Sequence, residues 1–569
     1  MAGVLGFCMV CKGWQNVNVW VSAVAVVLAP TVCLGAPHMM VVAANKLAAE
    51  AGLDVLHRGG TAVDAAVAVQ AVLGLVEPQA SGVGGGALML TYDAASRKIT
   101  AYDGRETAPA SAGPDLFLRP DGTPKSFYEA AMGGRSVGVP GAIAMLELAQ
   151  HASGRAHWAD LFQPAIRLAE NGFPLTERVA KMIAFEAPRI GRNAALQAYL
   201  MPNGLPAPGT IVKNEAYAAT LRQIAAHGSA GLLSGKIAGD IVATVHQDAN
   251  PGLLTEADLA AYRPLARSAI CAPYRGTTIC TSPPPSAGGI AVLQSLGMLA
   301  HFPLPTLAPD GPDAAMLILE AERLAMADRD AFGADADFVP VPVKGLIDPA
   351  YIAGRAKLID EVHAMAVAKP GSPEGVAPAA GAQLPEHGTS DVAIVDAAGN
   401  AVSLTTTIEY EFGAHLMVDG FLLNNELTDF ALAPTQDGKQ AANRVQGGKR
   451  PRSSMAPSLV LDHDGKLLAV VGSAGGGRIP GYVVQATVGV LDWHMTPAEA
   501  LAQGHIGSSG MHTDLEADTD AANLLPALKA RGEPVAVDPM GSGSSMILVT
   551  PTGLQGAADP RRDGAAVGQ

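Results

Sequence analysis

The sequence predicts an α+β fold, because a helical N-terminal region and a strongly β region occur in the same chain. Residues 42–76 carry small apolar and polar residues at helical spacing. Residues 391–408 are instead rich in β-branched residues and contain one turn. The two patterns differ in period, so they predict helices and an antiparallel hairpin in one protein.

The helical region divides into two helices. Asn45 to Leu56 forms the first, and Arg58-Gly59-Gly60 ends it, since glycine adopts the left-handed conformation that closes many helices. Thr61 caps the second helix, which runs through Leu73, because its hydroxyl can accept a hydrogen bond from the first turn.

A glycine-rich run follows these helices. Residues 81–87 (SGVGGGA) lead into a strand from Leu88 to Tyr92. A phosphate-binding loop would need Gly-Lys-Ser/Thr and a strand before the loop rather than after it. Close packing of the backbone is therefore the preferred explanation of these glycines.

Composition and charge exclude several classes of function. The chain has 569 residues, of which 49% are hydrophobic and 16% charged, and its formal net charge is −15. An acidic chain without a Lys/Arg tract repels phosphate backbones, so nucleic acid is not an expected partner. No repeat of the kind found in solenoids or propellers occurs.

The first 35 residues differ from the rest and are predicted to be a secretory signal. Lys12 is their only charge, and Val19 to Ala29 is an apolar run of the length found in such signals. We place the cut near Gly35–Ala36, because Pro37 is disfavoured as the first mature residue. A buried N-terminal helix or a membrane anchor is the alternative. The signal predicts a periplasmic or secreted protein with no membrane span after its removal.

Two cysteines, Cys271 and Cys280, lie beyond this leader. Tyr274-Arg275-Gly276 between them is typical of a hairpin turn, so a cross-strand disulfide and two buried free thiols both remain open. Neither His-Glu-x-x-His nor a Cys/His cluster occurs in the sequence. We therefore expect no metal and no cofactor.

A predicted linker ends where a predicted core hairpin begins. Residues 369–385 contain four prolines and show neither helical nor strand periodicity, which is typical of a mobile linker. Residues 391–396 and 401–408 then form the hairpin arms, with a turn at Ala397–Asn400. A flexible tether joined directly to a core strand suggests a break in the chain.

Cleavage between Gly388 and Thr389 would create a nucleophile with its own base. Thr389 would then carry an α-amine, whose unperturbed pKa is about 7.7 to 8.0, beside its hydroxyl. Pairing of Asp396 with Ala401 would place Thr407 diagonal to Thr389, where its hydroxyl could orient the amine or the Oγ. A strand or capping role for Thr389 is the alternative.

Several long segments, in order, resemble the γ-glutamyltransferase family. They are HGTSDVAIVDAAGNAVSLTTTIEYEFG, FLLNNELTDF, NRVQGGKRPRSSMAPSLV, GSAGGGRI, GGTAVDAAVAVQAVLGLVEPQASGVGGGALML, DGRETAPA, PPPSAGG and GAADPRRDGAAVG. The resemblance implies a four-layer αββα sandwich of the N-terminal-nucleophile hydrolase type. It also implies one precursor that cuts itself into a large subunit, residues 36–388, and a small subunit, residues 389–569, which form one intertwined domain.

The resemblance also assigns roles to individual residues. Thr389 would be the nucleophile for self-cleavage and catalysis, and Thr407 would support it. The substrate α-carboxylate would be held by Arg105, Ser453 and Ser454, the α-ammonium by Glu409, Glu426 and Asp429, and the oxyanion by the N–H groups of Gly475 and Gly476. The alternatives are a surface ion pair between Arg105 and Glu106 and a solvated face for the acids.

The chain departs from the family pattern at four places. Asp391 stands where members commonly have His, Ala474 replaces a proline, and Arg452 replaces an apolar residue. The stretch from Asp429 to Ser453 is shorter than in members with a full lid over the site. No catalytic atom is lost, so these departures concern the substrate range and the acceptor.

The predicted function is cleavage of γ-glutamyl amides such as glutathione, with the acyl group passed to water or an amine. Within the same fold, the alternative is an acylase that removes glutaryl-type side chains from β-lactams. A binding protein that keeps only the fold is disfavoured, because Thr389 and the pair Gly475 and Gly476 are present.

Overall fold

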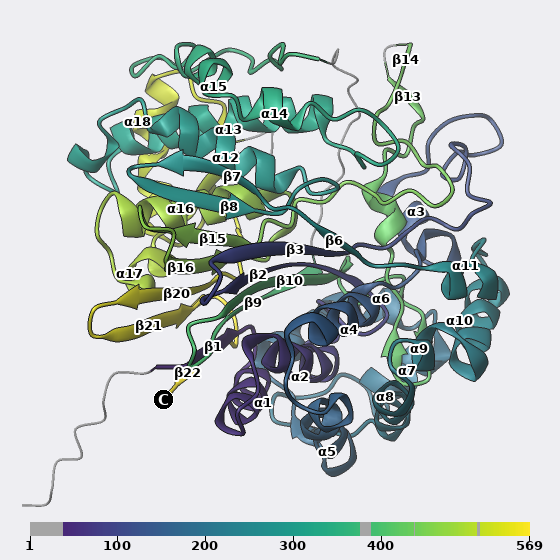
Figure 1. Ribbon diagram of the computed structural model, residues 1–569. Coiled ribbons are helices and arrows are strands. Elements are labelled where there is room, and N and C mark those ends of the chain that lie inside the picture. Colours follow the sequence, from purple (N-terminus) through teal and green to yellow (C-terminus); the bar gives the residue numbers. More distant parts are fainter. Residues whose placement is uncertain (1–37, 376–387, 437, 509–512) are drawn as a thin grey trace, which may run out of the picture. The chain divides into compact units, whose positions relative to one another are not determined.

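Two antiparallel sheets lie at the centre of the computed structural model, which describes residues 38–375, 388–436, 438–508 and 513–569 (Figure 1). The predicted leader, residues 1–35, lies outside this part of the chain. Of the predicted linker, residues 369–375 have neither helix nor strand, and residues 376–385 also lie outside it. The fold therefore concerns the chain from residue 38 onward.

The first sheet has seven strands, and segments from before and after Gly388 alternate in it. In spatial order these are β22 (Ala565–Gly568), β1 (Met40–Ala43), β9 (Gly388–Val395), β10 (Ala401–Glu409), β2 (Gly86–Asp93), β3 (Lys98–Gly104) and β6 (Leu265–Arg267).

The second sheet has six strands and mixes the two parts of the chain in the same way. Its order is β21 (Gly553–Ala558), β20 (Ser545–Thr550), β16 (Leu467–Gly472), β15 (Ser458–Leu461), β8 (Thr277–Thr281) and β7 (Ile270–Tyr274).

The sheets pack face to face. One cluster of buried side chains joins them and includes Ala393 and Val395 of the first sheet with Leu459, Val470 and Ile547 of the second. Because side chains alternate along a strand, the neighbours of Ala393 in β9 point to the opposite face. The strand β9 is therefore buried on both of its faces.

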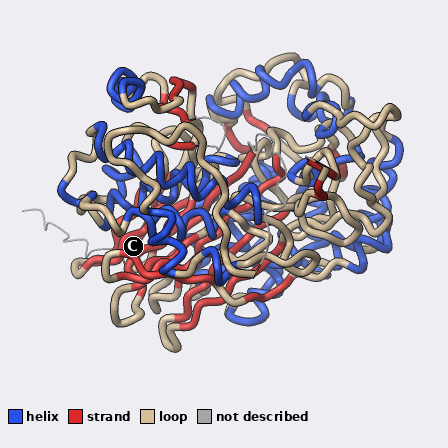
Figure 2. Tube along the Cα trace, turned by 90° about the horizontal axis from the view of Figure 1, so that it is seen from above, coloured by secondary structure: helices blue, strands red, loops and turns tan. Residues whose placement is uncertain are grey.

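Helices cover the other face of each sheet, as Figure 1 shows. The first sheet is covered by α1 (Lys46–His57), α2 (Ala62–Val76), α4 (Ala142–Ser153), α5 (Gln163–Asn171) and α8 (Glu215–His227). The second is covered by α12 (Gly288–Leu299), α13 (Pro312–Phe332) and α16 (Ile479–Leu491). Figure 2, seen from above, shows helices overlying the strands. The α+β prediction is confirmed.

The remaining elements surround these layers. The helices are α3 (Phe127–Ala131), α6 (Glu177–Ile190), α7 (Ala194–Leu200), α9 (Ala230–Leu233), α10 (Gly235–Gln247), α11 (Glu256–Ala261), α14 (Val343–Leu346), α15 (Pro349–Ala356), α17 (Pro497–Ala502) and α18 (Leu525–Ala530). The strands are β4 (Phe173–Pro174), β5 (Ile211–Val212), β11 (Met417–Val418), β12 (Phe421–Leu422), β13 (Thr435–Gln436), β14 (Lys439–Gln440), β17 (Ile506–Ser508), β18 (Thr513–Glu516) and β19 (Val535–Asp538). None of the helices in the described part of the chain has the length and apolarity to cross a bilayer.

The two predicted N-terminal helices are confirmed, with their caps. The Asn45 side chain accepts from the backbone N–H of Leu47, and Thr61 and Asp64 form a capping box at the start of α2. The second helix continues to Val76, three residues beyond the predicted end. Its last turn is apolar and buried, so packing extends it past the point that the sequence pattern marks.

The glycine run packs against backbone, as predicted. A β-carbon at Gly85 would lie 2.0 Å from the carbonyl oxygen of Thr407, and one at Gly84 would lie 2.1 Å from that of Leu422. Any side chain at these positions would push β10 or β12 away. The run therefore fixes how closely β2 approaches the strand that carries Thr407.

The predicted hairpin is present, but its predicted register was wrong by one residue. Val395, rather than Asp396, pairs with Ala401, and Thr407 therefore lies directly opposite Thr389. The Asp396 carboxylate instead accepts from the backbone N–H groups of Ala398 and Asn400, at 2.9 and 3.0 Å, which commits it to the turn. Turn chemistry thus sets the register.

The cysteine pair, which the sequence left open, is a disulfide. Cys271 of β7 and Cys280 of β8 are directly paired across the hairpin and are bonded, with an S–S distance of 2.07 Å. The turn between the two strands falls at Arg275 and Gly276, as the sequence predicted. This bond is compatible with an oxidising compartment.

Candidate active site

Two threonine hydroxyls meet the peptide bond between Gly388 and Thr389 at the start of β9. The Thr407 hydroxyl donates to the carbonyl oxygen of Gly388 and accepts from the backbone N–H of Glu409 at 2.8 Å. The Thr389 hydroxyl lies 3.5 Å from that of Thr407. Both threonines are buried, with 4% and 3% of their surface exposed. The chain is continuous here, so the structure is that of an uncut precursor.

A bulge in β10 turns the residue after this pair toward the loop that follows. The pairing with β9 shifts between Thr407 and Glu409, and Glu409 has a φ of +77°. Its carboxylate accepts hydrogen bonds from the Asn425 side chain and, at 3.3 Å, from the Thr428 hydroxyl. The strained backbone thereby brings Glu409 against the 3₁₀ turn η4 (Glu426–Asp429).

Arg105 follows the end of β3 and is buried, with 1% of its surface exposed. Its two terminal nitrogens bind the carboxylates of Glu426 and Asp429, and Glu106 lies 3.9 Å away. Burial alone would lower the pKa of Arg105, but Glu426 and Asp429 outweigh it and raise this pKa. The alternatives of a surface ion pair and a solvated acidic face are therefore wrong.

The segment that carries the two predicted serines also holds this arginine. Arg105 donates from Nε to the carbonyl oxygen of Pro451 at 3.2 Å and from Nη2 to that of Arg452 at 2.8 Å. Ser453 accepts from the backbone N–H of Met455 at 3.1 Å, while Ser454 accepts from the Arg329 guanidinium. The serines thus follow directly on the backbone that positions Arg105.

Gly475 and Gly476 come directly after β16, before α16. Both have positive φ, 130° and 59°, which favours glycine at these positions. A β-carbon at Gly475 would lie 2.5 Å from the Tyr482 ring, so this backbone is tightly packed. The strand β16 packs on β9, which brings the glycine loop to the end of the sheet that carries Thr389.

Arg562 is a site residue to which the sequence analysis gave no role. Its Nη1 donates to the carbonyl oxygen of Thr389 and its Nε to that of Ser542, both at 2.6 Å. Burial and the nearby Arg178 lower the pKa of Arg562 to about 10. It lies in the segment GAADPRRDGAAVG, but a contact to a backbone carbonyl leaves no spacing pattern that could have revealed it.

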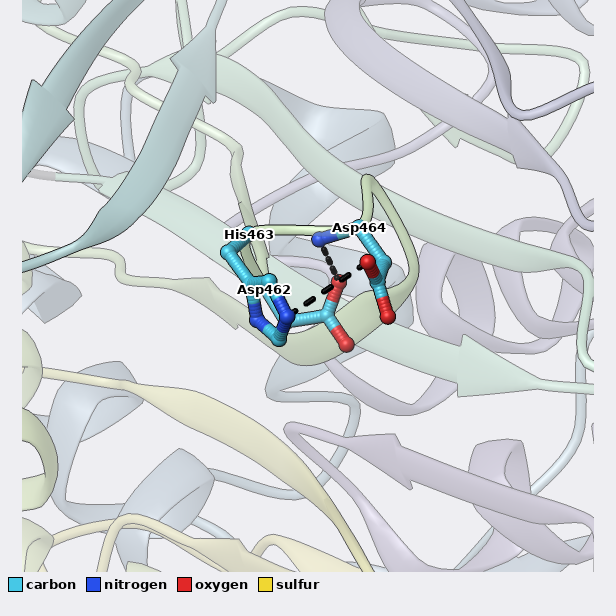
Figure 3. A group of neighbouring side chains, drawn as sticks. All are labelled: Asp462, His463 and Asp464. Atoms are coloured by element: carbon cyan, nitrogen blue, oxygen red, sulfur yellow. Dashed lines mark hydrogen bonds and ion pairs between the residues drawn. The ribbon is translucent and has the colours of Figure 1, made fainter.

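One group of potential metal ligands lies on a turn instead. Figure 3 shows Asp462, His463 and Asp464 between β15 and β16. The Asp462 carboxylate accepts from the backbone N–H groups of Asp464 and Lys466, both at 2.8 Å, and the Lys466 ammonium lies 3.7 Å from Asp464. These contacts explain the group as a hydrogen-bonded turn with its own cation.

A Gly-x-Ser-x-Gly pattern at residues 134–138 does not form a nucleophile elbow. Ser136 ends the 3₁₀ turn η1 (Gly134–Ser136), and its hydroxyl donates to the carbonyl oxygens of Ala131 and Gly133 at 2.6 and 3.0 Å. An elbow would present the serine between a strand and a helix. The buried Ser136 hydroxyl stabilises a turn.

Comparisons with known proteins agree with this geometry. The family described as gamma-glutamyltranspeptidase matches residues 48–569. The glutathione hydrolase proenzyme of Bacillus subtilis (strain 168) is 38% identical over 543 residues, 93% of this chain and 91% of that protein. The acylase ACY 1 proenzyme of Pseudomonas sp. (strain V22) is 36% identical over 538 residues, 93% of each chain.

A solved structure extends the likeness to three dimensions. The cephalosporin acylase from Bacillus halodurans superimposes with a TM-score of 0.81 at 26% identity, covering 94% of this chain and 96% of that one. A family match over nearly the whole described chain, and relatives above a third identity over nine tenths of their length, decide the assignment. The chain belongs to the γ-glutamyltranspeptidase family.

Proposed function

We propose that this protein is a self-processing amidohydrolase and acyltransferase that cleaves γ-glutamyl amides, of which glutathione is one, through an ester on Thr389. The observation that carries the proposal is the contact of Thr407 with both the Thr389 hydroxyl and the Gly388 carbonyl. A hydroxyl in that place can orient the nucleophile and donate to the oxygen on which negative charge develops. The names of the relatives, glutathione hydrolase proenzymes, support the substrate class.

Self-cleavage begins with attack of the Thr389 Oγ on the carbonyl carbon of Gly388. The Oγ proton is transferred to the Thr389 nitrogen as the C–N bond breaks, which leaves an ester and a free α-amine. Thr407 donates to the carbonyl oxygen during this step. Water then hydrolyses the ester, giving the Gly388 carboxylate and restoring the Thr389 hydroxyl.

Catalysis repeats this chemistry on a substrate. The α-amine of Thr389 takes the hydroxyl proton, Oγ attacks the γ-carbonyl carbon, and the amine product leaves with the proton. The backbone N–H groups of Gly475 and Gly476 stabilise the oxyanion. Arg105 with Ser453 and Ser454, and Glu409 with Glu426 and Asp429, hold the two charged ends of the glutamyl group. Water or an acceptor amine then releases the acyl group.

The subunit organisation is part of the proposal. We assign residues 36–388 to the large subunit and 389–569 to the small one, within the four-layer αββα sandwich of N-terminal-nucleophile hydrolases. The layers of helices, two sheets and helices support that fold, and strands from both parts in each sheet support an intertwined domain. The charge-poor apolar leader and the disulfide support a periplasmic or secreted location.

We expect the mature protein to run as two non-covalently associated chains. Residues 389–569 number 569 − 388 = 181. The smaller band should therefore run at about 18 kDa, taking mass as proportional to length. N-terminal sequencing of that band should begin Thr-Ser-Asp-Val. A fully active protein that stays one chain would contradict the mechanism.

An acylase for glutaryl side chains is the second candidate, supported by the cephalosporin acylase structure and the acylase ACY 1 relatives. Glutaryl groups carry the carboxylate but no α-ammonium. Initial rates on a γ-glutamyl anilide and a glutaryl anilide, measured with the purified processed protein, separate the two. We expect faster turnover of the γ-glutamyl compound, and the opposite order would favour the acylase.

A further inference from the structure

Asp391 lies in the gap between the two sheets, two residues after Thr389. The two side chains share one face of β9, and their partners Thr407 and Thr405 share one face of β10. The Thr405 hydroxyl donates to the Asp391 carboxylate at 2.8 Å. The nucleophile pair and this second pair are therefore adjacent rungs of one ladder.

The same carboxylate reaches across to the second sheet. Ser545, the first residue of β20, donates its hydroxyl to the other carboxylate oxygen of Asp391. Ser545 is paired with Gly472, the last residue of β16, and a β-carbon at Gly472 would lie 2.3 Å from the Asp391 carboxylate. Only glycine fits there, so the carboxylate rests directly on the end of β16.

The end of β16 leads straight into the proposed oxyanion loop. Three residues separate Gly472 from Gly476, and the Ser473 hydroxyl accepts from the Ser544 hydroxyl at 2.9 Å. Asp391 thus contacts β10, β16 and β20 at the point where the nucleophile strand and the oxyanion loop approach one another. A shift of either one by a fraction of an ångström would change the distance between Oγ and the oxyanion donors.

We propose that Asp391 is a positioning residue, which holds the strand of the nucleophile Thr389 at a fixed distance from the loop of Gly475 and Gly476 through Ser545 and Thr405. This inference rests on the proposed function for the identity of the reacting groups. It assigns Asp391 no contact with substrate. Loss of the carboxylate should therefore lower kcat and slow self-cleavage while KM stays unchanged.

The charge of Asp391 provides a readout that a merely structural residue would not give. Burial raises the pKa of Asp391 to about 7, against the hydrogen bonds from Ser545 and Thr405 and the charge of Arg562. Arg562 is the charged group that acts on it, because β10, β16 and β20 face it with Thr405, Gly472 and Ser545. The carboxylate therefore changes charge near neutral pH, in the range where the enzyme is assayed.

The sign of the stability effect follows from this raised pKa. The folded protein binds the Asp391 proton more tightly than the unfolded chain, in which an aspartate has a pKa of about 3.9. That stabilisation is fully present below the unfolded pKa and is lost as the pH rises through about 7. At pH 8 the ionised carboxylate opposes folding, so its neutral isostere should be at least as stable as the wild type.

The test is Asp391→Asn, with kcat, KM, the rate of self-cleavage and Tm measured between pH 5 and 9. We expect kcat on a γ-glutamyl anilide at pH 8 to fall between about tenfold and a hundredfold, the cost of a small misplacement of reacting groups. KM should be unchanged, and Tm at pH 8 should be equal or higher. The step in kcat near pH 7 should also disappear, leaving only the ionisation of the Thr389 amine.

Three further variants make the outcome decisive. Ser545→Ala should lower kcat in the same way, and its effect should not add to that of Asp391→Asn, because both remove one link. Asp396→Asn is the matched control, since Asp396 is a buried carboxylate just past the other end of β9 and should change Tm but not kcat. Thr389→Ala reports on the proposed function separately, because it removes the nucleophile itself.

An unchanged kcat in Asp391→Asn overturns the proposal, and so does a fall in kcat that only accompanies a fall in Tm. If Asp391→Asn does not accumulate as folded protein, Ser545→Ala carries the same readouts, and an unchanged kcat there overturns the proposal equally. Should the wild type turn over no γ-glutamyl substrate, the proposed function fails. The rate of self-cleavage in Asp391→Asn then still tests the positioning role.

Discussion

Thr389→Ala is expected to remain a single chain and to turn over no γ-glutamyl amide. The reason is that one oxygen atom serves both reactions, first against the carbonyl carbon of Gly388 and then against the substrate. The structure places no other hydroxyl of the described residues so that it could replace this one, because the Thr407 hydroxyl already donates to the Gly388 oxygen and accepts from Glu409. Gel electrophoresis over several days and an anilide assay measure the two losses.

Two variants test whether the loss is specific to this hydroxyl. Thr389→Ser keeps a hydroxyl beside the amine and should retain some of both activities. Ser390→Ala removes the next hydroxyl along β9, which points to the opposite face, where the Ser81 hydroxyl donates to it at 3.2 Å. It should be processed at close to the wild-type rate. Cleavage before residue 389 in Thr389→Ala would show that another group does the cutting.

Local patterns predicted the parts of the fold that local chemistry determines. Asn45 and Thr61 cap the helices that they were expected to cap, and the turn at Arg275 falls where the sequence places it. The hairpin register was missed by one residue, because the Asp396 carboxylate bonds within the turn and so ends the strand at Val395. A side-chain hydrogen bond of that kind competes with the ladder and is invisible to an alternation pattern.

The arrangement of the candidate site depends on long-range packing, and the sequence could give only its membership. Arg105, Glu426 and Asp429 were expected at opposite ends of a bound amino acid, yet the structure brings them into contact. That contact depends on where β3 ends and where η4 lies, over 320 residues apart in sequence. Asp391 was noticed only as a departure from a family pattern, and its partners lie on three other strands.

The contact between Arg105 and the acids changes what a mutation at the site should do. Arg105→Ala would leave Glu426 and Asp429 buried without their cation, and removing one partner of a buried pair typically costs about 3–5 kcal/mol of stability. That variant would confound folding with binding. Asp429→Asn is the sharper choice, because it keeps the shape and one hydrogen bond to Arg105 while it removes one negative charge.

Asp429→Asn is expected to lower kcat/KM strongly for a γ-glutamyl anilide and to leave a glutaryl anilide unaffected or improved. The γ-glutamyl substrate loses the carboxylate that pairs with its α-ammonium, whereas the glutaryl substrate has no ammonium. In addition, Arg105 is released from one of its two carboxylate partners and becomes freer to bind the carboxylate that both substrates carry. The ratio of the two kcat/KM values should move by at least about tenfold, or ~1.4 kcal/mol.

Glu106→Gln is the matched control for this change of charge. Glu106 is equally buried but lies 3.9 Å from Arg105, and burial with the neighbouring Glu426 raises its pKa well above the usual range. Because it is not assigned to the substrate ammonium, its replacement should change kcat/KM for both substrates by the same factor. If the ratio moves with Glu106→Gln and stays fixed with Asp429→Asn, then Asp429 serves only to hold Arg105. The carboxylate would then be the one charged group of the substrate that this part of the site recognises, and the glutaryl acylase would become the better description of the enzyme.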